Sequence, residues 1–156
     1  MAKNKEGVLL SFKSKIKALG KEDRSGFIFT KEWADKLLSD PSVNPMLSDF
    51  GGIPGLNDSP QHSGEIPLGE VSFMCTSMYV DDDYLVGEFD VLDTPKGRSF
   101  VSLLRQQKID KSGMYNCVSL SGTGSVIGMS NIVDPDTYEL TCPYFIDRSA
   151  REVIEE

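Results

Sequence analysis

Apolar and polar residues alternate along the first part of the chain, which is the pattern of a strand with one buried face. The stretch "GVLLSFKSKIKAL" (7–19) shows this alternation most clearly. Its apolar face carries Val8, Leu10, Phe12, Ile16 and Ala18, and its polar face carries Ser11, Lys13, Lys15 and Lys17. A turn over 20–26 and a short strand over 27–29 are expected to follow. Thr30 can then cap a helix that runs to about Ser39.

Two further strands and a second helix are predicted in the middle of the chain. The runs "EVSFMCTSMYV" (70–80) and "YLVGEFDVL" (84–92) indicate a hairpin, and the run "DDD" between them indicates its turn. A helix is expected over 93–109. Thr94 can cap this helix, and Pro95 suits its first position, where the missing N–H costs nothing.

The last part of the chain predicts more strands. "MYNCVSL" (114–120) runs into the Ser/Gly-rich stretch "SGTGS" (121–125). "VIGMSNIV" (126–133) and "YELTCPYFI" (138–146) are expected to form a final pair of strands. The pattern as a whole predicts an α+β fold with a mostly antiparallel sheet and about two helices.

One segment lacks any periodic pattern. Of the 25 residues from 40 to 64, 17 are Gly, Pro, Ser, Asn or Asp. An unstructured connection of this length in a compact domain is usually functional or disordered. The only histidine of the chain, His62, lies near its end.

Composition narrows the function classes. A chain of 156 residues suits one soluble domain, and its net charge of −8 disfavours contact with nucleic-acid phosphates. No apolar run is long enough to span a membrane, and the N-terminus has no signal-peptide pattern. The three widely spaced cysteines, Cys75, Cys117 and Cys142, fit no metal motif and are expected to be reduced core thiols.

Ser119 and His62 are the residues with the clearest chemical interest. In the 114–120 strand Val118 and Leu120 face one layer, so Ser119 faces the other, just before the Ser/Gly-rich stretch. A serine hydroxyl needs a base near neutral pH, and His62 is the only imidazole. Glycines let successive N–H groups converge on an oxyanion. A solvated histidine and an ordinary Ser/Gly-rich turn explain the same residues, and neither a Walker A loop nor a G-x-S-x-G elbow is present.

The order of several motifs resembles that of a known family. "RSGFIFTKEWADKLL" is followed by the histidine, then by "VGEFDVLDTPKG", "VSLSGTGSV" and the closing "YFIDRSA". This order is similar to that of the prohead core proteases of tailed phages, especially the T-even type, which are related in fold to the herpesvirus capsid-maturation proteases. The resemblance covers roughly residues 8–150 and implies a mostly antiparallel sheet or barrel with a few flanking helices.

The resemblance implies roles for individual residues. Ser119 corresponds to the nucleophile and His62 to the general base, and the backbone N–H groups of Gly124 and Ser125 correspond to oxyanion donors. The family pattern is broken at four points, where Ser63, Ser121, the pair Ser125–Val126 and Pro143 replace proline, arginine, an arginine pair and aspartate.

The third catalytic residue has no direct match. Its family position falls near Tyr138 and Glu139, which makes Glu139 the first choice and Asp90 the second, because a carboxylate could hold the imidazole of His62.

The resemblance also implies an activity. A serine endopeptidase without cofactor or metal would cleave phage scaffold (core) proteins and the major capsid protein, after glutamate, inside the prohead in the bacterial cytoplasm. It would occupy residues 1–156 as one protease domain, with a loop at 40–64 and a C-terminal tail at 151–156.

The chain ends in "VIEE", which is similar to the family's cleavage pattern and implies self-cleavage near Glu156. An acidic solvated tail explains the same residues. The herpesvirus relatives suggest a homo-oligomer, while contact with nucleic acid or a membrane is not expected. Two alternatives stay open: a catalytically inactive, scaffold-binding prohead protein of the same fold, and an unrelated small β-rich binding module.

Overall fold

A single curved sheet organises the molecule, with strand order β1-β4-β3-β2-β6-β5 in the part of the chain that the computed structural model describes, residues 7–23, 26–40, 53–57 and 68–146. Neighbouring strands are antiparallel, except β2 and β6, which are parallel. The elements are β1 (Val8–Ala18), α1 (Lys31–Leu38), β2 (Ile53–Leu56), a 3₁₀ turn (Leu68–Glu70), β3 (Val71–Asp81), β4 (Tyr84–Leu92), α2 (Pro95–Arg105), β5 (Val118–Thr123) and β6 (Glu139–Phe145).

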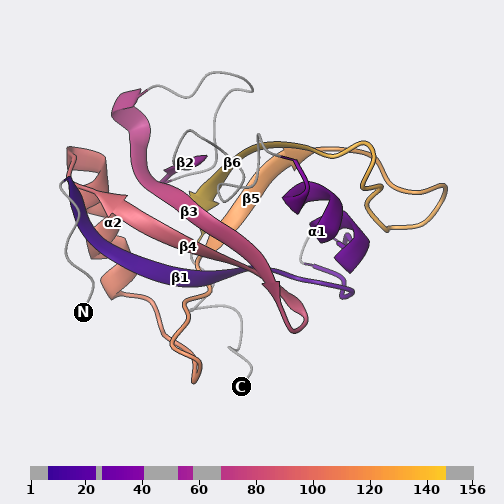
Figure 1. Ribbon diagram of the computed structural model, residues 1–156, viewed down its shortest axis with the longest axis horizontal. Coiled ribbons are helices and arrows are strands. Elements are labelled where there is room, and N and C mark those ends of the chain that lie inside the picture. The colour runs from indigo at the N-terminus through magenta and orange to yellow at the C-terminus, as the bar shows by residue number, and fades with distance from the viewer. Residues whose placement is uncertain (1–6, 24–25, 41–52, 58–67, 147–156) are drawn as a thin grey trace.

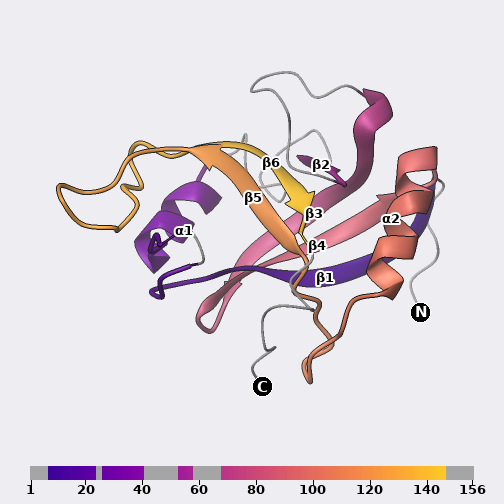
Figure 2. The same ribbon diagram turned by 180° about the vertical axis from the view of Figure 1, so that it is seen from behind.

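The three long strands β1, β4 and β3 lie side by side, and β6 and β5 cross behind them (Figure 1). Helix α2 lies at one end of the long strands and α1 near the other, as the reverse view also shows (Figure 2). The expected α+β class with a mostly antiparallel sheet is therefore confirmed. Within the described ranges, neither helix has the length and apolarity needed to cross a bilayer.

Aromatic side chains fill the space between the long strands and α2. Phe12 of β1 stacks on Phe89 of β4 with ring centroids 5.0 Å apart, and Phe73 of β3 lies 4.8 Å from Phe100 of α2. All four side chains are buried. Each aromatic pair adds about 1 kcal/mol beyond the area that it buries, so this cluster is a main source of the stability that fixes α2 on the sheet.

Both helices begin where the sequence predicts. The Thr30 hydroxyl accepts a hydrogen bond from the N–H of Trp33 (3.1 Å), and the Thr94 hydroxyl accepts one from the N–H of Gly97 (3.0 Å). Helix α2 ends at Arg105, four residues before the predicted end at 109. The polar run that follows has no apolar stripe to bury, so packing does not extend the helix there.

Three predicted segments differ from the structure. The 40–64 segment is not wholly without structure, because β2 lies within it. Residues 27–29 form no strand, since only Ile28 makes isolated bridges. Residues 126–133 form a turn rather than a strand. Gly128 has a φ of 56°, and the N–H of Ile127 donates to the carbonyl of Ile132 (2.9 Å). β6 therefore pairs with β5 and β2 instead.

Candidate active site

Ser119 lies in the middle of β5, and its side chain faces away from the main core. Its neighbours Val118 and Leu120 belong to that core, as the alternation of the strand predicts. Ser119 is directly opposite Tyr144 of β6, which packs on a second, smaller apolar cluster formed by Leu56, Val71 and Cys142. Because cross-strand partners project from the same face, Ser119 lies beside this second cluster.

Ser119 is 5% exposed, and within the described part of the chain its hydroxyl has no hydrogen-bonding partner. Antiparallel pairing with β6 fixes its backbone. Among the described residues, the fully buried side-chain polar atoms without a partner belong to Trp33 and Asn57, so the Ser119 hydroxyl keeps some contact with solvent. The arrangement leaves Ser119 available to a base or a substrate.

Three residues on the neighbouring strands β2, β6 and β5, including Ser119, lie opposite one another. Leu56 at the end of β2 pairs with Tyr144, which pairs with Ser119. Two strand spacings place the backbones of Leu56 and Ser119 about 10 Å apart. His62 itself lies outside the described residues, but it follows Leu56 by six positions, and six residues of chain reach up to about 20 Å. The connectivity therefore allows His62 to reach Ser119.

The two candidate third residues lie apart from Ser119. Glu139 is opposite Thr123, which places it four residues along β5, about 13 Å from Ser119, and its side chain is exposed. Asp90 lies on β4, is 7% exposed, and accepts a hydrogen bond from the hydroxyl of Ser11 (2.7 Å). The structure brings neither carboxylate next to Ser119, and their roles stay predictions.

The Ser/Gly-rich stretch is partly strand. β5 continues through Thr123, so Gly124 follows Ser119 by five residues, roughly 16 Å along an extended chain. The N–H of Ser125 donates to the hydroxyl of Thr137 (2.9 Å). The structure does not bring Gly124 or Ser125 next to Ser119, and their role as oxyanion donors also stays a prediction.

The glycines of this stretch have a different use from the expected one. Neither Gly122 nor Gly124 has a positive φ. A Cβ atom at Gly122 would lie 2.4 Å from the hydroxyl oxygen of Tyr138. Gly122 is therefore needed because Tyr138 packs directly against its backbone.

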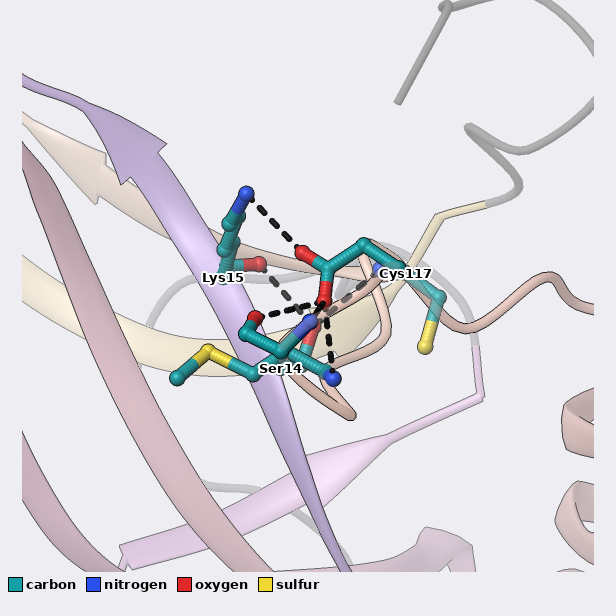
Figure 3. Close-up of polar contacts among 6 residues, drawn as sticks. Ser14, Lys15 and Cys117 are labelled. Atoms are coloured by element: carbon teal, nitrogen blue, oxygen red, sulfur yellow. Dashed lines mark hydrogen bonds and ion pairs between the residues drawn. The ribbon is translucent and has the colours of Figure 1, made fainter. Parts of the chain in front are cut away.

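A polar cluster that the sequence did not indicate lies where the chain enters β5. The N–H of Cys117, two residues before Ser119, donates to the hydroxyl of Ser14 on β1 (3.1 Å). Lys15, the next residue on β1, forms a 2.9 Å ion pair with Asp110. Figure 3 shows β1 and the segment before β5 joined by these contacts. One signal was available in the sequence, since Asp110 begins the turn "DKSG", where an Asp side chain commonly binds the backbone that follows.

The Asp110 carboxylate is held by several donors. It accepts hydrogen bonds from the N–H and the hydroxyl of Ser112 (2.8 and 2.5 Å) and from the N–H of Met114 (3.1 Å). Burial raises the pKa of this carboxyl, but the hydrogen bonds from Ser112, Lys15 and Met114, with the charge of Lys15, together lower its pKa to about 2. The Lys15 ammonium also lies 4.3 Å from the centre of the Tyr84 ring.

The cysteines and the acidic residues show no metal site in the described part of the chain, where no three potential metal ligands gather. Cys75, Cys117 and Cys142 are buried free thiols, as predicted. Burial raises the pKa of Cys75 to about 12 and that of Cys142 to about 11. The thiols of Cys75 and Cys142 are therefore expected to be protonated and unreactive near neutral pH.

The fold is similar to that of a solved phage capsid protease, as the motif order had indicated. The particular structure that it resembles is that of the bacteriophage T4 capsid assembly protease, gp21, with a TM-score of 0.67 over 87% of this chain and 80% of that chain. The two sequences are 14% identical, so the likeness establishes the fold. No family model and no curated protein matches the chain.

Proposed function

We propose that the protein is a serine endopeptidase of phage prohead maturation. The observation that carries this proposal is the placement of Ser119. Its side chain is nearly buried and lies on a strand aligned, across β6, with the end of β2 from which the chain leads to His62. The likeness of the fold to a capsid assembly protease supports the same function.

In the proposed reaction the Ser119 oxygen attacks the carbonyl carbon of the substrate peptide bond. His62 accepts the hydroxyl proton and then donates a proton to the leaving amine, which breaks the carbon–nitrogen bond. Water, activated by His62, hydrolyses the acyl-enzyme and regenerates the serine hydroxyl. The pairing of β5 with β6 already fixes the backbone of Ser119, so no conformational entropy is lost in positioning the nucleophile during the reaction.

The third catalytic position has two candidates with different support. Glu139 follows from the order of residues in the resembling family. Asp90 has the support of burial, since a shielded carboxylate stabilises an imidazolium more strongly than an exposed one. Asp90 also projects from the same face of β4 as Glu88, opposite the core residues Phe89 and Val91.

The proposed substrates are phage scaffold and capsid proteins, cleaved after glutamate inside the prohead within the bacterial host. Self-cleavage near Glu156 and assembly into a homo-oligomer belong to the same proposal. The protease domain would include all of residues 1–156.

A second candidate function is a catalytically inactive, scaffold-binding prohead protein of the same fold. Two observations favour it: Glu139 and Asp90 both lie away from Ser119, and the N–H of Ser125 is already bonded to Thr137. A substrate-free protease can show the same features, because catalytic hydrogen bonds often form only in the substrate complex.

Cleavage of the cognate scaffold protein by purified variants tests the proposal. Ser119→Ala and His62→Ala are each expected to lose at least about 1,000-fold in kcat/KM, since nucleophile and base act as a unit. The matched control is Ser121→Ala, two positions along the same strand, which should keep near-normal activity.

The same variants test self-processing. A chain extended beyond Glu156 should shorten in the wild type, by intact mass, and stay whole in Ser119→Ala. Equal scaffold cleavage by the wild type, Ser119→Ala and His62→Ala would reject the catalytic assignment. Tight scaffold binding without any cleavage by the wild type would favour the inactive alternative.

A further inference from the structure

We propose that Lys15 and Asp110 are positioning residues for Ser119, because their ion pair fixes the segment through which the chain enters β5. The inference rests on the proposed function of Ser119. Neither residue contacts the reacting atoms, and both act through the backbone between Asp110 and Ser119.

β5 is the last strand in the sheet order, so among the described strands only β6 holds it by ladder hydrogen bonds. Its other edge faces β1, and the contact there comes from the residues just before it. The N–H of Tyr115 donates to the carbonyl of Lys13, and the N–H of Lys15 donates to the carbonyl of Tyr115, both at 2.9 Å. With the bond from Cys117 to Ser14, these contacts join the two ends of the curved sheet.

Asp110 fixes the conformation of the turn that precedes β5 and links this turn to β1. One carboxylate oxygen closes the turn by accepting from Ser112 and Met114, and the other binds the ammonium of Lys15. The Lys15 and Asp110 side chains are only 14% and 3% exposed. Removing one charge would leave the other buried without its partner, which is far more costly than losing an exposed pair.

The path from the ion pair to the nucleophile is short. Met114, bonded to Asp110, is followed by Tyr115 and Cys117, which both bond to β1, and Ser119 comes two residues later. The carbonyl of Cys117 also accepts from the N–H of Ile146, beyond the end of β6. Cys117 is therefore held from both sides, and loss of the β1 side would let the start of β5 shift.

A second ion pair on the same strand provides a matched control. Lys17 and Asp23 lie 3.1 Å apart, with side chains 12% and 23% exposed. This pair resembles Lys15–Asp110 in chemistry and burial, but it connects β1 to the turn before Phe27 rather than to β5.

The experiment compares Lys15→Met and Asp110→Asn with the controls Lys17→Met and Asp23→Asn. Hydrogen exchange of the amides from 117 to 120 reports the fixing of β5, and steady-state cleavage of the scaffold protein reports its catalytic consequence. In the Lys15 and Asp110 variants we expect these amides to exchange roughly tenfold faster. We also expect kcat to fall by about 100-fold with KM nearly unchanged, because a displacement of about 1 Å has that effect.

A rescue variant separates positioning from general destabilisation. Lys15→Arg keeps the cation and is expected to recover most of the kcat that Lys15→Met loses. If Lys15→Met does not fold, the isosteric Asp110→Asn provides the same comparison. The controls should leave exchange in β5 and kcat near wild-type values.

Exchange in β5 that is no faster than in the controls would overturn the inference, and so would faster exchange with unchanged kcat. If the wild type cleaves nothing, the proposed function fails, and the catalytic part of the inference fails with it. In that case the exchange rates still decide whether the ion pair holds β5, so the two failures are distinguishable.

Discussion

The Asp110 carboxylate shows how much one side chain can organise. It accepts three hydrogen bonds from residues of its own turn and forms an ion pair with Lys15 of β1. Its side chain is almost fully buried. Donors that favour the charged form lower its pKa to about 2, against an ordinary value of 3.8. A carboxyl whose pKa is lower in the folded state stabilises that state above its ordinary pKa and loses this contribution as the pH falls.

We therefore predict that Asp110→Asn destabilises the protein at neutral pH and that the difference from the wild type narrows as the pH falls from about 4 toward about 2. The narrowing should approach 2 kcal/mol in the free energy of unfolding, at about 1.4 kcal/mol for each unit of pKa shift. Urea unfolding at stepped pH measures it. Asp136→Asn serves as the control, because its ion pair with Lys36 is exposed. A difference that stays constant over this range would contradict the prediction.

At the scale of elements, α2 depends on a close approach between Gly97 and the end of β4. A Cβ atom at Gly97 would lie 1.7 Å from the carbonyl oxygen of Leu92, a backbone atom that cannot move aside cheaply. The helix is also fixed here by its cap, since the N–H of Gly97 donates to Thr94. Packing of α2 on the sheet therefore requires glycine at this position.

Replacing Gly97 with alanine is predicted to destabilise the fold by about 1–3 kcal/mol or more, as overpacking does. In a helix with open space around the glycine, the same replacement stabilises the protein by up to about 1 kcal/mol. A loss of stability on Gly97→Ala would therefore come from the close approach to Leu92. Chemical denaturation measures the difference. Gly69→Ala is the matched control: Gly69 has open space around its Cα and no positive φ, so its replacement should be nearly neutral. Equal effects at both positions would show that the close approach does not matter.

Strong periodicity made the long elements predictable from the sequence. β1, β3, β4 and both helix caps lie where alternation and the threonines indicated. Short elements were missed, because β2 has only four residues and contains Pro54 and Gly55. The run 126–133 has the apolar content of a strand, but the left-handed conformation of Gly128 turns it back on itself.

The candidate site was predictable only in part. Alternation correctly placed Ser119 on the face opposite Val118 and Leu120. The ion pair with Asp110 was not predictable, because Lys15 is one of three alternating lysines and nothing local distinguishes it from Lys13 or Lys17. Only the folded chain brings β1 to the segment before β5.

At the scale of the whole molecule, the reactivity of the three thiols measures how often the sheet opens. Cys75, Cys117 and Cys142 are each fully buried and belong to β3, the segment before β5, and β6. We predict that none reacts with a thiol reagent in the native protein at neutral pH and that all three react in denaturant. Because exposure requires opening of the sheet, the native reaction rate should follow the free energy of unfolding. Fast reaction of any thiol in the native state, measured by absorbance and mass, would contradict this.

The contact between β1 and the segment before β5 can form only late in translation of the chain. Ser14 and Cys117 are 103 residues apart in the chain. At about 5–20 residues per second, a ribosome takes roughly 5–20 s to make that interval, so one edge of β1 waits unpaired for most of translation. An unpaired edge invites association with other nascent chains, and lysines along a strand oppose it. The alternating lysines of β1 are therefore expected to oppose such association while the chain is being made.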